Sequence, residues 1–287
     1  MCLFIKMDSK VISQIKKGKL PKILILNGGG IKGLAQIGAL EYLDENHYLE
    51  KIKTVACTSV GSIVGLGLVL GYTPKEMHIL AEKLNLNNLH RHNYQELFTK
   101  HGLDDGEKLD FLLKKIIEKK TKKPLITLKE LYQWKKINLI ITTAELNEGK
   151  EIYLNHESFP DLPVYLAIRM SCAVPFIFCP VEYQEKCYID GGCADDYPIA
   201  LFKDQLNEVL GIHLKYIYQT QIKTFEDMVI SCMYCILNAS NREAEIYKNN
   251  TLEIEISSKL FVSLDVSLET KKELLKKGYE CAKKYFD

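Results

Sequence analysis

Residues 22–33 read KILILNGGGIKG, an apolar run that ends in three consecutive glycines. Four branched aliphatic side chains in succession predict a strand that is buried on both faces. The glycines permit positive φ angles and a close approach of the main chain to a ligand. The helix predicted after them adds unpaired N–H groups and a partial positive charge at its start. The stretch therefore predicts a strand, a glycine turn and a helix, with a turn that suits a phosphate or an oxyanion.

Apolar runs of strand length recur along the chain, and segments with helical spacing such as Leu34–Tyr42 separate them. This alternation favours an α/β fold with a largely parallel sheet. Capping-box patterns at Thr73 and Thr127 predict two helix starts around the sheet. The predicted strands are Ile23–Leu26, Ile52–Ala56, Ile137–Thr142, Glu208–Leu214 and Leu252–Ile256, and a final helix is predicted over Leu268–Phe286.

The composition indicates a globular protein without a strong overall charge. Among 287 residues, 38 Lys and Arg stand against 37 Asp and Glu, a formal net charge of +1, so we expect no nucleic-acid partner. The weakly polar stretch Val55–Tyr72 contains four glycines, and we expect it to be buried rather than to span a membrane. The start lacks an apolar run of signal-peptide length and the nine cysteines are scattered, which favours a cytoplasmic protein.

One large domain over residues 1–287 is expected, because no linker or composition shift divides the chain. We expect its core over about residues 20–215, with residues 216–287 as a mainly helical C-terminal extension packed on it. Within the core, Glu107–Lys123 places leucine and isoleucine on one face and crowds six of its seven lysines elsewhere, namely Lys114, Lys115, Lys119, Lys120, Lys122 and Lys123. This pattern favours a core helix with a solvated face, and a helix that lies on an anionic membrane is the alternative.

The glycine turn also satisfies the dinucleotide fingerprint GxGxxG, through Gly28, Gly30 and Gly33. That fingerprint needs an acidic residue at the end of the next strand, to bind the ribose. Here the strand runs into Cys57-Thr58-Ser59, and Glu50 precedes it. Dinucleotide binding is therefore the less favoured interpretation of the loop.

Two further motifs bear on chemistry. Residues 57–61 read CTSVG, close to the nucleophile elbow GxSxG, in which a sharp strand-to-helix turn exposes a serine hydroxyl. Residues 188–192 read YIDGG, a short strand that ends in a carboxylate at a glycine turn. The stretch Ala167–Pro180 before it is apolar and could line a pocket for a lipid ester. Such a pocket would raise the basicity of the aspartate.

In this order and context, these segments resemble the patatin-like phospholipases. The resemblance implies a three-layer α/β/α fold with a mostly parallel central sheet, and hydrolysis of acyl esters of lipids by a Ser-Asp dyad. Ser59 then matches the nucleophile and Asp190 its partner. The oxyanion-hole loop matches Gly28, Gly29 and Gly30, and supporting positions are Lys32, Gly33, Cys57, Gly61, Gly191 and Gly192.

Three positions depart from the family pattern. Asn27 stands where the family usually has aspartate, Cys57 replaces the elbow glycine, and Lys32 replaces a frequent arginine. None of the three removes a catalytic group. Lysine keeps the charge but loses the planar fork of arginine, so a bidentate contact would be lost.

Other reactive side chains are interpreted as structural. Only His213 follows Asp190 as a candidate for a Ser-His-Asp triad, and its apparent core strand favours a structural histidine. His90-Arg91-His92 lacks further ligands at zinc spacing and fits a surface loop. Cys232 and Cys235 are expected on one core face. The sequence does not decide whether Asp195 and Asp196 support Asp190 or are exposed charges.

The expected function is a phospholipase A-type lipid acyl hydrolase that needs neither a metal nor another cofactor. Its substrate would be a phospholipid or another acyl lipid at a membrane surface, with the protein peripheral to that membrane. Oligomeric state does not follow from the sequence. A catalytically silent or partner-activated lipid- or protein-binding relative is the main alternative, since an intact dyad alone does not prove a productive pocket.

Overall fold

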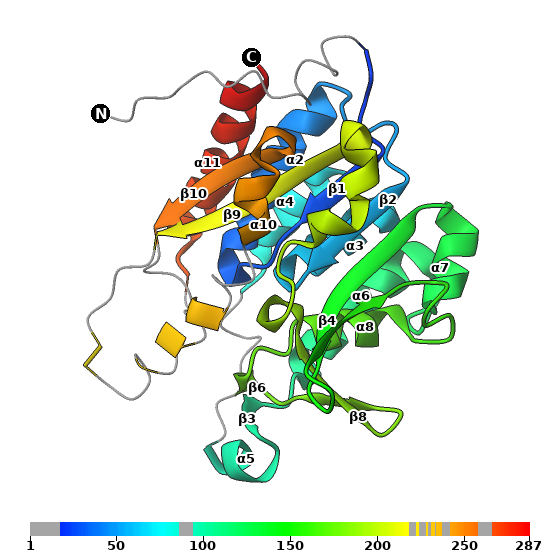
Figure 1. The fold of residues 1–287 in the computed structure, drawn as a ribbon, viewed down its shortest axis with the longest axis vertical. Coiled ribbons are helices and arrows are strands. Elements are labelled where there is room, and N and C mark those ends of the chain that lie inside the picture. Colours follow the sequence, from blue (N-terminus) through cyan, green and yellow to red (C-terminus); the bar gives the residue numbers. More distant parts are fainter. Residues whose placement is uncertain are drawn as a thin grey trace.

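The computed structural model describes residues 18–85, 94–217, 222–223, 228, 231–232, 234–236, 242–257 and 266–287. Its centre is a mostly parallel sheet in the order β10-β9-β1-β2-β4-β8-β7, with β5 paired to β4 (Figure 1). The parallel strands are β1 (Ile23–Leu26), β2 (Thr54–Thr58), β4 (Asn138–Glu145), β9 (Val209–Ile217) and β10 (Thr251–Ser257). The antiparallel strands are β5 (Lys150–Leu154), β7 (Val181–Tyr183) and β8 (Lys186–Asp190).

Helices cover both faces of this sheet, which confirms the predicted three-layer α/β/α fold. The α-helices are α2 (Gly33–Glu45), α3 (Val60–Leu70), α4 (Pro74–Lys83), α5 (Tyr94–Thr99), α6 (Glu107–Thr121), α7 (Leu128–Lys135), α8 (Val164–Ser171), α10 (Arg242–Ile246) and α11 (Leu268–Phe286). Short 3-10 helices are η1 (Gly30–Lys32), η3 (Gly191–Cys193), η4 (Pro198–Glu208) and η5 (Lys248–Asn250).

Alternate side chains of β1 point to two different cores. Leu24 and Leu26 join the larger core with residues of α2, α3, α6, α8 and α11. Ile23 and Ile25 join a smaller core on the opposite face, with Tyr197 and residues of η4 and α10. Because both faces are buried, the strand is apolar at every position, as expected for a central parallel strand.

The five predicted strands are confirmed as β1, β2, β4, β9 and β10, each within three residues of its expected limits. Both capping boxes are confirmed, since the hydroxyls of Thr73 and Thr127 accept the third amide of α4 and α7. The stretch Val55–Tyr72 forms most of β2 and all of α3. Among the described residues, no helix has both the length and the apolar character needed to cross a bilayer.

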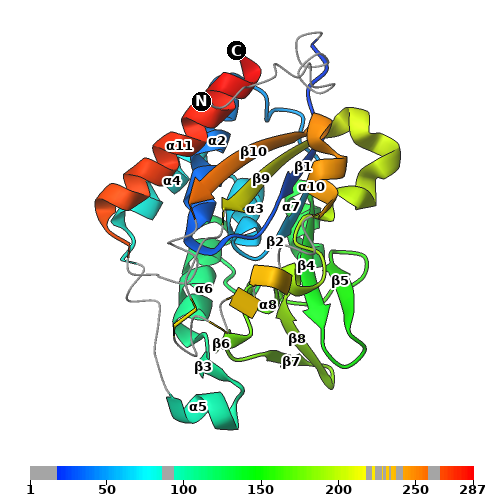
Figure 2. The same cartoon turned by 60° about the vertical axis from the view of Figure 1, so that its left-hand side comes forward.

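The chain beyond residue 216 contributes a strand to the central sheet as well as helices that pack on it. β10 pairs with β9 in parallel, and the expected boundary near residue 215 lies inside β9. α11 packs on α2 at two glycines that let the main chains come into contact. A Cβ on Gly38 would lie 1.8 Å from the Leu275 carbonyl oxygen, and a Cβ on Gly278 would lie 1.8 Å from the Ala35 carbonyl oxygen. Figure 2 shows the two helices side by side.

A small second sheet lies beyond the lower end of the central sheet. It consists of the parallel pair β3 (Gly102–Asp104) and β6 (Phe176–Phe178), with α5 beyond them (Figure 2). The buried Arg169 of α8 ties this unit down by donating to the main-chain oxygens of Asp105 (3.0 Å) and Cys179 (3.1 Å).

Candidate active site

Ser59 occupies the sharp turn between β2 and α3. Its φ of 52° and ψ of −128° are unusual for a residue with a side chain, and such strain is commonly retained at functional sites. The close packing of the turn requires Gly61, because a Cβ there would lie 2.5 Å from the Asn27 carbonyl oxygen. The local geometry is therefore that of the strand–turn–helix elbow predicted from CTSVG.

Ser59 and Asp190 meet although 131 positions separate them. The Ser59 hydroxyl donates to Asp190 Oδ2 at 2.6 Å. β4 brings them together: it pairs with β2 on one side, Thr58 opposite Thr142, and with β8 on the other, Thr143 opposite Asp190. The two residues thus stand at the ends of strands that share one neighbour.

The Asp190 carboxyl group is almost completely buried, at 2% exposure. Burial raises its pKa to about 7, because a charged carboxylate loses its hydration there. Hydrogen bonds from the Ser59 hydroxyl and the Gly192 amide (2.8 Å to Oδ1) oppose this shift by favouring the charged form. Asp190 therefore titrates near neutral pH, where it can both accept and return a proton.

The main chain of Ser59 is held by two hydroxyl groups that sequence reasoning did not single out. Its amide donates to Ser171 Oγ at 2.8 Å, and its carbonyl oxygen accepts from Ser62 Oγ. Ser171 ends α8, and the carbonyl oxygen of Ala173, two residues later, accepts the amide of Asp190 at 2.9 Å. The stretch 167–180 therefore contacts both members of the pair.

The glycine loop lies directly against the elbow. A Cβ on Gly28 would lie 3.1 Å from Ser59 Cβ and 2.4 Å from Asp196 Oδ1, so any larger residue would displace the Asp196 carboxylate and crowd Ser59. The Gly28 amide donates to Asp196 Oδ1 at 2.9 Å. Gly30 has a φ of 53°, the left-handed region that favours glycine, and begins η1. The loop thus presents the main chain to Ser59, with its first amide engaged by Asp196.

Asp196 and Asn27 form a buried pair behind the loop. Asn27 Nδ2 donates to Asp196 Oδ2 at 3.2 Å and to the Leu214 carbonyl oxygen at 3.2 Å, and Asn27 Oδ1 accepts the Leu214 amide at 2.8 Å. The open question about the two aspartates is thereby answered: Asp196 contacts the glycine loop, and Asp195 accepts from the Tyr153 hydroxyl at 2.8 Å. Asparagine at position 27 is complementary to the neighbouring carboxylate.

The remaining supporting residues surround this centre. Lys32 is buried in η1, and burial lowers its pKa to about 8. A Cβ on Gly33 would lie 2.6 Å from the Val60 side chain, and one on Gly191 would lie 2.3 Å from the Thr142 carbonyl oxygen. The Cys57 thiol faces β4, with its sulfur 3.3 Å from the Ile140 carbonyl oxygen, and burial raises its pKa. These positions shape the turn by close packing.

The alternative reactive groups lie elsewhere. His213 is buried on β9, where it packs on the Tyr197 ring at 5.0 Å and lies 3.9 Å from Glu253. The prediction that Cys232 and Cys235 share a core face is wrong, since both are exposed in a region that buries little of either side chain. His90-Arg91-His92 lies outside the described residues. No group of three His, Cys, Asp or Glu side chains suited to a metal ion occurs within the described segments.

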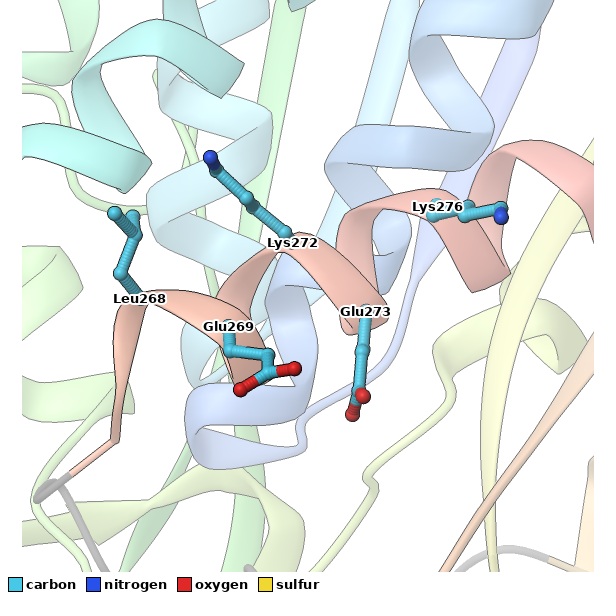
Figure 3. Close-up of a pocket in the computed structure, with 5 residues that line it drawn as sticks. All are labelled: Leu268, Glu269, Lys272, Glu273 and Lys276. Atoms are coloured by element: carbon cyan, nitrogen blue, oxygen red, sulfur yellow. The ribbon is translucent and has the colours of Figure 1, made fainter.

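A shallow pocket elsewhere on the surface does not involve these residues. It is lined by Leu268, Glu269, Lys272, Glu273 and Lys276, all from α11 (Figure 3). Their side chains extend from a single helix. The pocket therefore gives no reason to move the candidate site away from Ser59.

The fold is an α/β/α sandwich in which the serine at a sharp strand-to-helix turn donates to a buried aspartate rather than to a histidine. The family model described as "Patatin-like phospholipase" matches residues 24–203, which is more than half of the chain. The chain belongs to the patatin-like phospholipase family.

The chain is also similar to curated proteins of two viruses. "Uncharacterized protein R571" of Acanthamoeba polyphaga mimivirus is 33% identical over 211 residues, covering 72% of this chain and 69% of that protein. "Probable lipid hydrolase 463L" of Invertebrate iridescent virus 6 is 32% identical over 188 residues, covering 64% and 63%. The chain thus spans about two thirds of the length of these relatives.

Solved structures share the fold. VipD from Legionella pneumophila superposes with a TM-score of 0.61 at 16% identity, covering 93% of this chain and 67% of that chain. The type III effector ExoU, from Pseudomonas aeruginosa, gives a TM-score of 0.56 at 16% identity, covering 93% and 52%. At this identity the likeness concerns the fold alone.

Proposed function

We propose that this protein hydrolyses fatty-acyl esters of phospholipids, in the manner of a phospholipase A, with Ser59 as nucleophile and Asp190 as its base. The observation that supports this most strongly is the 2.6 Å hydrogen bond from the Ser59 hydroxyl to Asp190 Oδ2. A serine hydroxyl is a weak nucleophile until a base takes its proton. The pKa of Asp190, raised by burial to about 7, makes that carboxylate a stronger base than an ordinary aspartate.

In the first step, Ser59 Oγ forms a bond to the ester carbonyl carbon while its proton passes to Asp190. The tetrahedral intermediate collapses, the ester C–O bond breaks, and Asp190 returns the proton to the departing alcohol. In the second step, water gives a proton to Asp190 and attacks the acyl-serine, and the proton then returns to Ser59 Oγ as the fatty acid leaves. Each proton taken is thereby returned, so the cycle balances.

The negative charge of the intermediate needs main-chain donors. Gly28, Gly29 and Gly30 form the oxyanion loop in this proposal, and their amides have different roles. The Gly28 amide, bound to Asp196, fixes the position of the loop. The amides of Gly29 and Gly30 are then the donors to the oxyanion, each contributing about 3 kcal/mol of transition-state stabilisation.

The test is turnover of a soluble short-chain fluorogenic ester, together with labelling by a fluorophosphonate probe. Ser59→Ala should abolish both signals in folded protein, and Asp190→Asn should reduce turnover by at least about a hundredfold because an amide cannot accept the proton. Ser158→Ala, in the turn after β5, is the matched control and should behave like the unaltered protein. Turnover retained by Ser59→Ala would contradict the proposal.

A partner- or lipid-activated form of the same site is the second candidate. It is favoured by one observation: Ser59 is only 8% exposed and Asp190 only 2%, so the site is nearly closed. Its substrate would be a phospholipid or another acyl lipid at a membrane surface. If the probe labels Ser59 only after vesicles or a cell extract are added, the activated form is supported over constitutive turnover.

A further inference from the structure

The end of α8 contacts the main chains of both proposed catalytic residues. Ser171, the last residue of α8, accepts the amide of Ser59 on its hydroxyl oxygen at 2.8 Å. Two residues later, the carbonyl oxygen of Ala173 accepts the amide of Asp190 at 2.9 Å. One short segment therefore fixes the two main chains that must meet for the 2.6 Å contact between Ser59 Oγ and Asp190 Oδ2.

The Ser59 amide needs an acceptor from outside its own helix. Ser59 is the N-cap of α3, and the first amides of a helix have no carbonyl partner within it. The Ser171 hydroxyl supplies the acceptor in a place closed to solvent, since Ser171 is 0% exposed. A backbone N–H has a single proton to donate, so loss of this hydroxyl would leave a buried donor unpaired. The turn, with a φ of 52° at Ser59, would then lose a contact that maintains its uncommon conformation.

The carbonyl side of Ser59 depends less on any one side chain. This carbonyl oxygen accepts from the Ser62 hydroxyl and also from the Ser62 amide, the latter at 2.8 Å. It therefore keeps a partner if the Ser62 hydroxyl is removed. Of the two hydroxyl groups that contact the Ser59 main chain, that of Ser171 has the greater influence on its position.

The support that carries Ser171 is itself fixed. Arg169, two residues earlier in α8, is buried and donates to the main-chain oxygens of Asp105 at 3.0 Å and Cys179 at 3.1 Å. Its Nε lies 3.8 Å from Asp110 Oδ1. These contacts join α8 to the segment before α6 and to the segment after β6. A hydroxyl on such a support can define where the Ser59 amide lies, rather than follow it.

We propose that Ser171 is a positioning residue for ester hydrolysis: by accepting the Ser59 amide, its hydroxyl group holds the nucleophile in hydrogen-bond contact with Asp190. This inference rests on the proposed function, in which Ser59 attacks the ester. Ser171 takes no proton in the reaction and acts only through the main chain of Ser59. Such positioning matters because a displacement of about 1 Å can slow a reaction by about a hundredfold.

The experiment compares three variants of Ser171 in turnover of the soluble short-chain ester by folded protein. Ser171→Ala removes the hydroxyl, whereas Ser171→Thr and Ser171→Val add the same branched shape and differ in whether a hydroxyl is present. Ser171→Ala should lower kcat by about tenfold to a hundredfold, and Ser171→Thr should exceed Ser171→Val by about tenfold or more. KM should change by less than about twofold, because Ser171 is fully buried and contacts main chain. The rate of fluorophosphonate labelling at Ser59 should fall in parallel with kcat.

The pH dependence of turnover gives a readout that a general loss of stability would not move. Burial raises the pKa of Asp190, and the hydrogen bond from the Ser59 hydroxyl opposes this shift. If Ser171→Ala displaces that hydroxyl, the midpoint of the profile should move to higher pH by about half a unit or more. Among the described residues, the other titratable groups that interact electrostatically with Asp190 are Asp196, Cys172 and Cys193, and none of them is altered.

Tyr72→Phe is the matched control for the loss of a buried hydrogen bond. The Tyr72 hydroxyl donates to the Ile116 carbonyl oxygen at 2.9 Å, beyond the end of α3 that is farther from Ser59. This variant should lower the melting temperature while kcat and the pH midpoint stay unchanged.

Unaltered kcat in Ser171→Ala, or equal kcat in Ser171→Thr and Ser171→Val, would overturn the inference and leave the proposed function intact. A lower kcat in Ser171→Ala without a shift of the pH midpoint would assign Ser171 to overall stability and would also overturn it. If Ser171→Val does not fold, Ser171→Ala against Ser171→Thr decides the same question. If the unaltered protein neither cleaves the ester nor is labelled at Ser59, the proposed function fails and this inference fails with it.

Discussion

At the scale of single residues, the environment of Asp190 sets the pH at which the proposed chemistry can operate. Burial raises the pKa of this carboxyl group to about 7, and the reaction needs its ionised form. Turnover of a soluble ester should therefore rise about tenfold per pH unit below pH 7 and level off above it. A profile already flat from pH 5 would show that Asp190 titrates as an ordinary aspartate or is not the base.

The Asn27–Asp196 pair gives a second prediction at this scale. Asn27→Asp would place two buried carboxylates about 3.2 Å apart, measured from the present Nδ2–Oδ2 distance, and should lower the free energy of unfolding by about 3 kcal/mol or more. Adding Asp196→Asn restores a donor opposite the carboxylate. Because Asn27 also donates to the Leu214 carbonyl oxygen, the recovery should be partial, about 1 kcal/mol or more.

Urea unfolding of the unaltered protein, both single variants and the double variant gives the coupling energy of this pair. Strictly additive losses would show that Asn27 and Asp196 do not act on each other. Ester turnover of the same four proteins reports whether the glycine loop returns to its position with the pair.

At the scale of secondary structure elements, the α2–α11 contact depends on two glycines. Alanine usually stabilises a helix interior relative to glycine by up to about 1 kcal/mol. Gly38→Ala should do the reverse and destabilise the protein by about 2–4 kcal/mol, because its Cβ would meet the Leu275 carbonyl oxygen at 1.8 Å. Lys277→Ala, at an exposed position of α11, is the control and should change the melting temperature little. A neutral Gly38→Ala would show that α11 can move away from α2 without loss.

The elements themselves were largely predictable, because their signals are local. Buried strands such as β1 are recognised as short apolar runs. Each capping box, at Thr73 and at Thr127, is contained within four consecutive residues. The elbow and glycine loop were found for the same reason. The roles of Ser171 and Asp196 were not predicted. Ser171 contacts Ser59 across 112 positions and Asp196 contacts Gly28 across 168 positions, and contacts over such separations produce no local pattern in the sequence.

At the scale of the whole molecule, the raised pKa of Asp190 suits the proposed chemistry but lowers the free energy of unfolding near neutral pH. In the unfolded chain its carboxyl group ionises near pH 4, whereas in the folded protein burial raises the pKa to about 7. Between these values the folded state binds a proton that the unfolded state has released. The free energy of unfolding therefore falls as pH rises through this window, by about 4 kcal/mol from this group.

Asp190→Asn removes this penalty while it keeps a polar side chain of the same shape. The variant should be more stable than the unaltered protein at pH 8, by up to about 4 kcal/mol, and equal to it at pH 4. Chemical denaturation at the two pH values checks the difference. A constant difference at both values would indicate a change in packing rather than in ionisation.

The turn at Gly149 between β4 and β5 is exposed, and no atom lies near the position of a Cβ on this residue. Ser59, which directly follows β2, precedes this turn, and Asp190, the last residue of β8, follows it; both strands pair with β4. Cleaving the polypeptide here would leave two fragments that each hold one residue of the proposed catalytic pair. Fused to interacting baits, such fragments would form a split reporter whose signal depends on reassembly of the sheet.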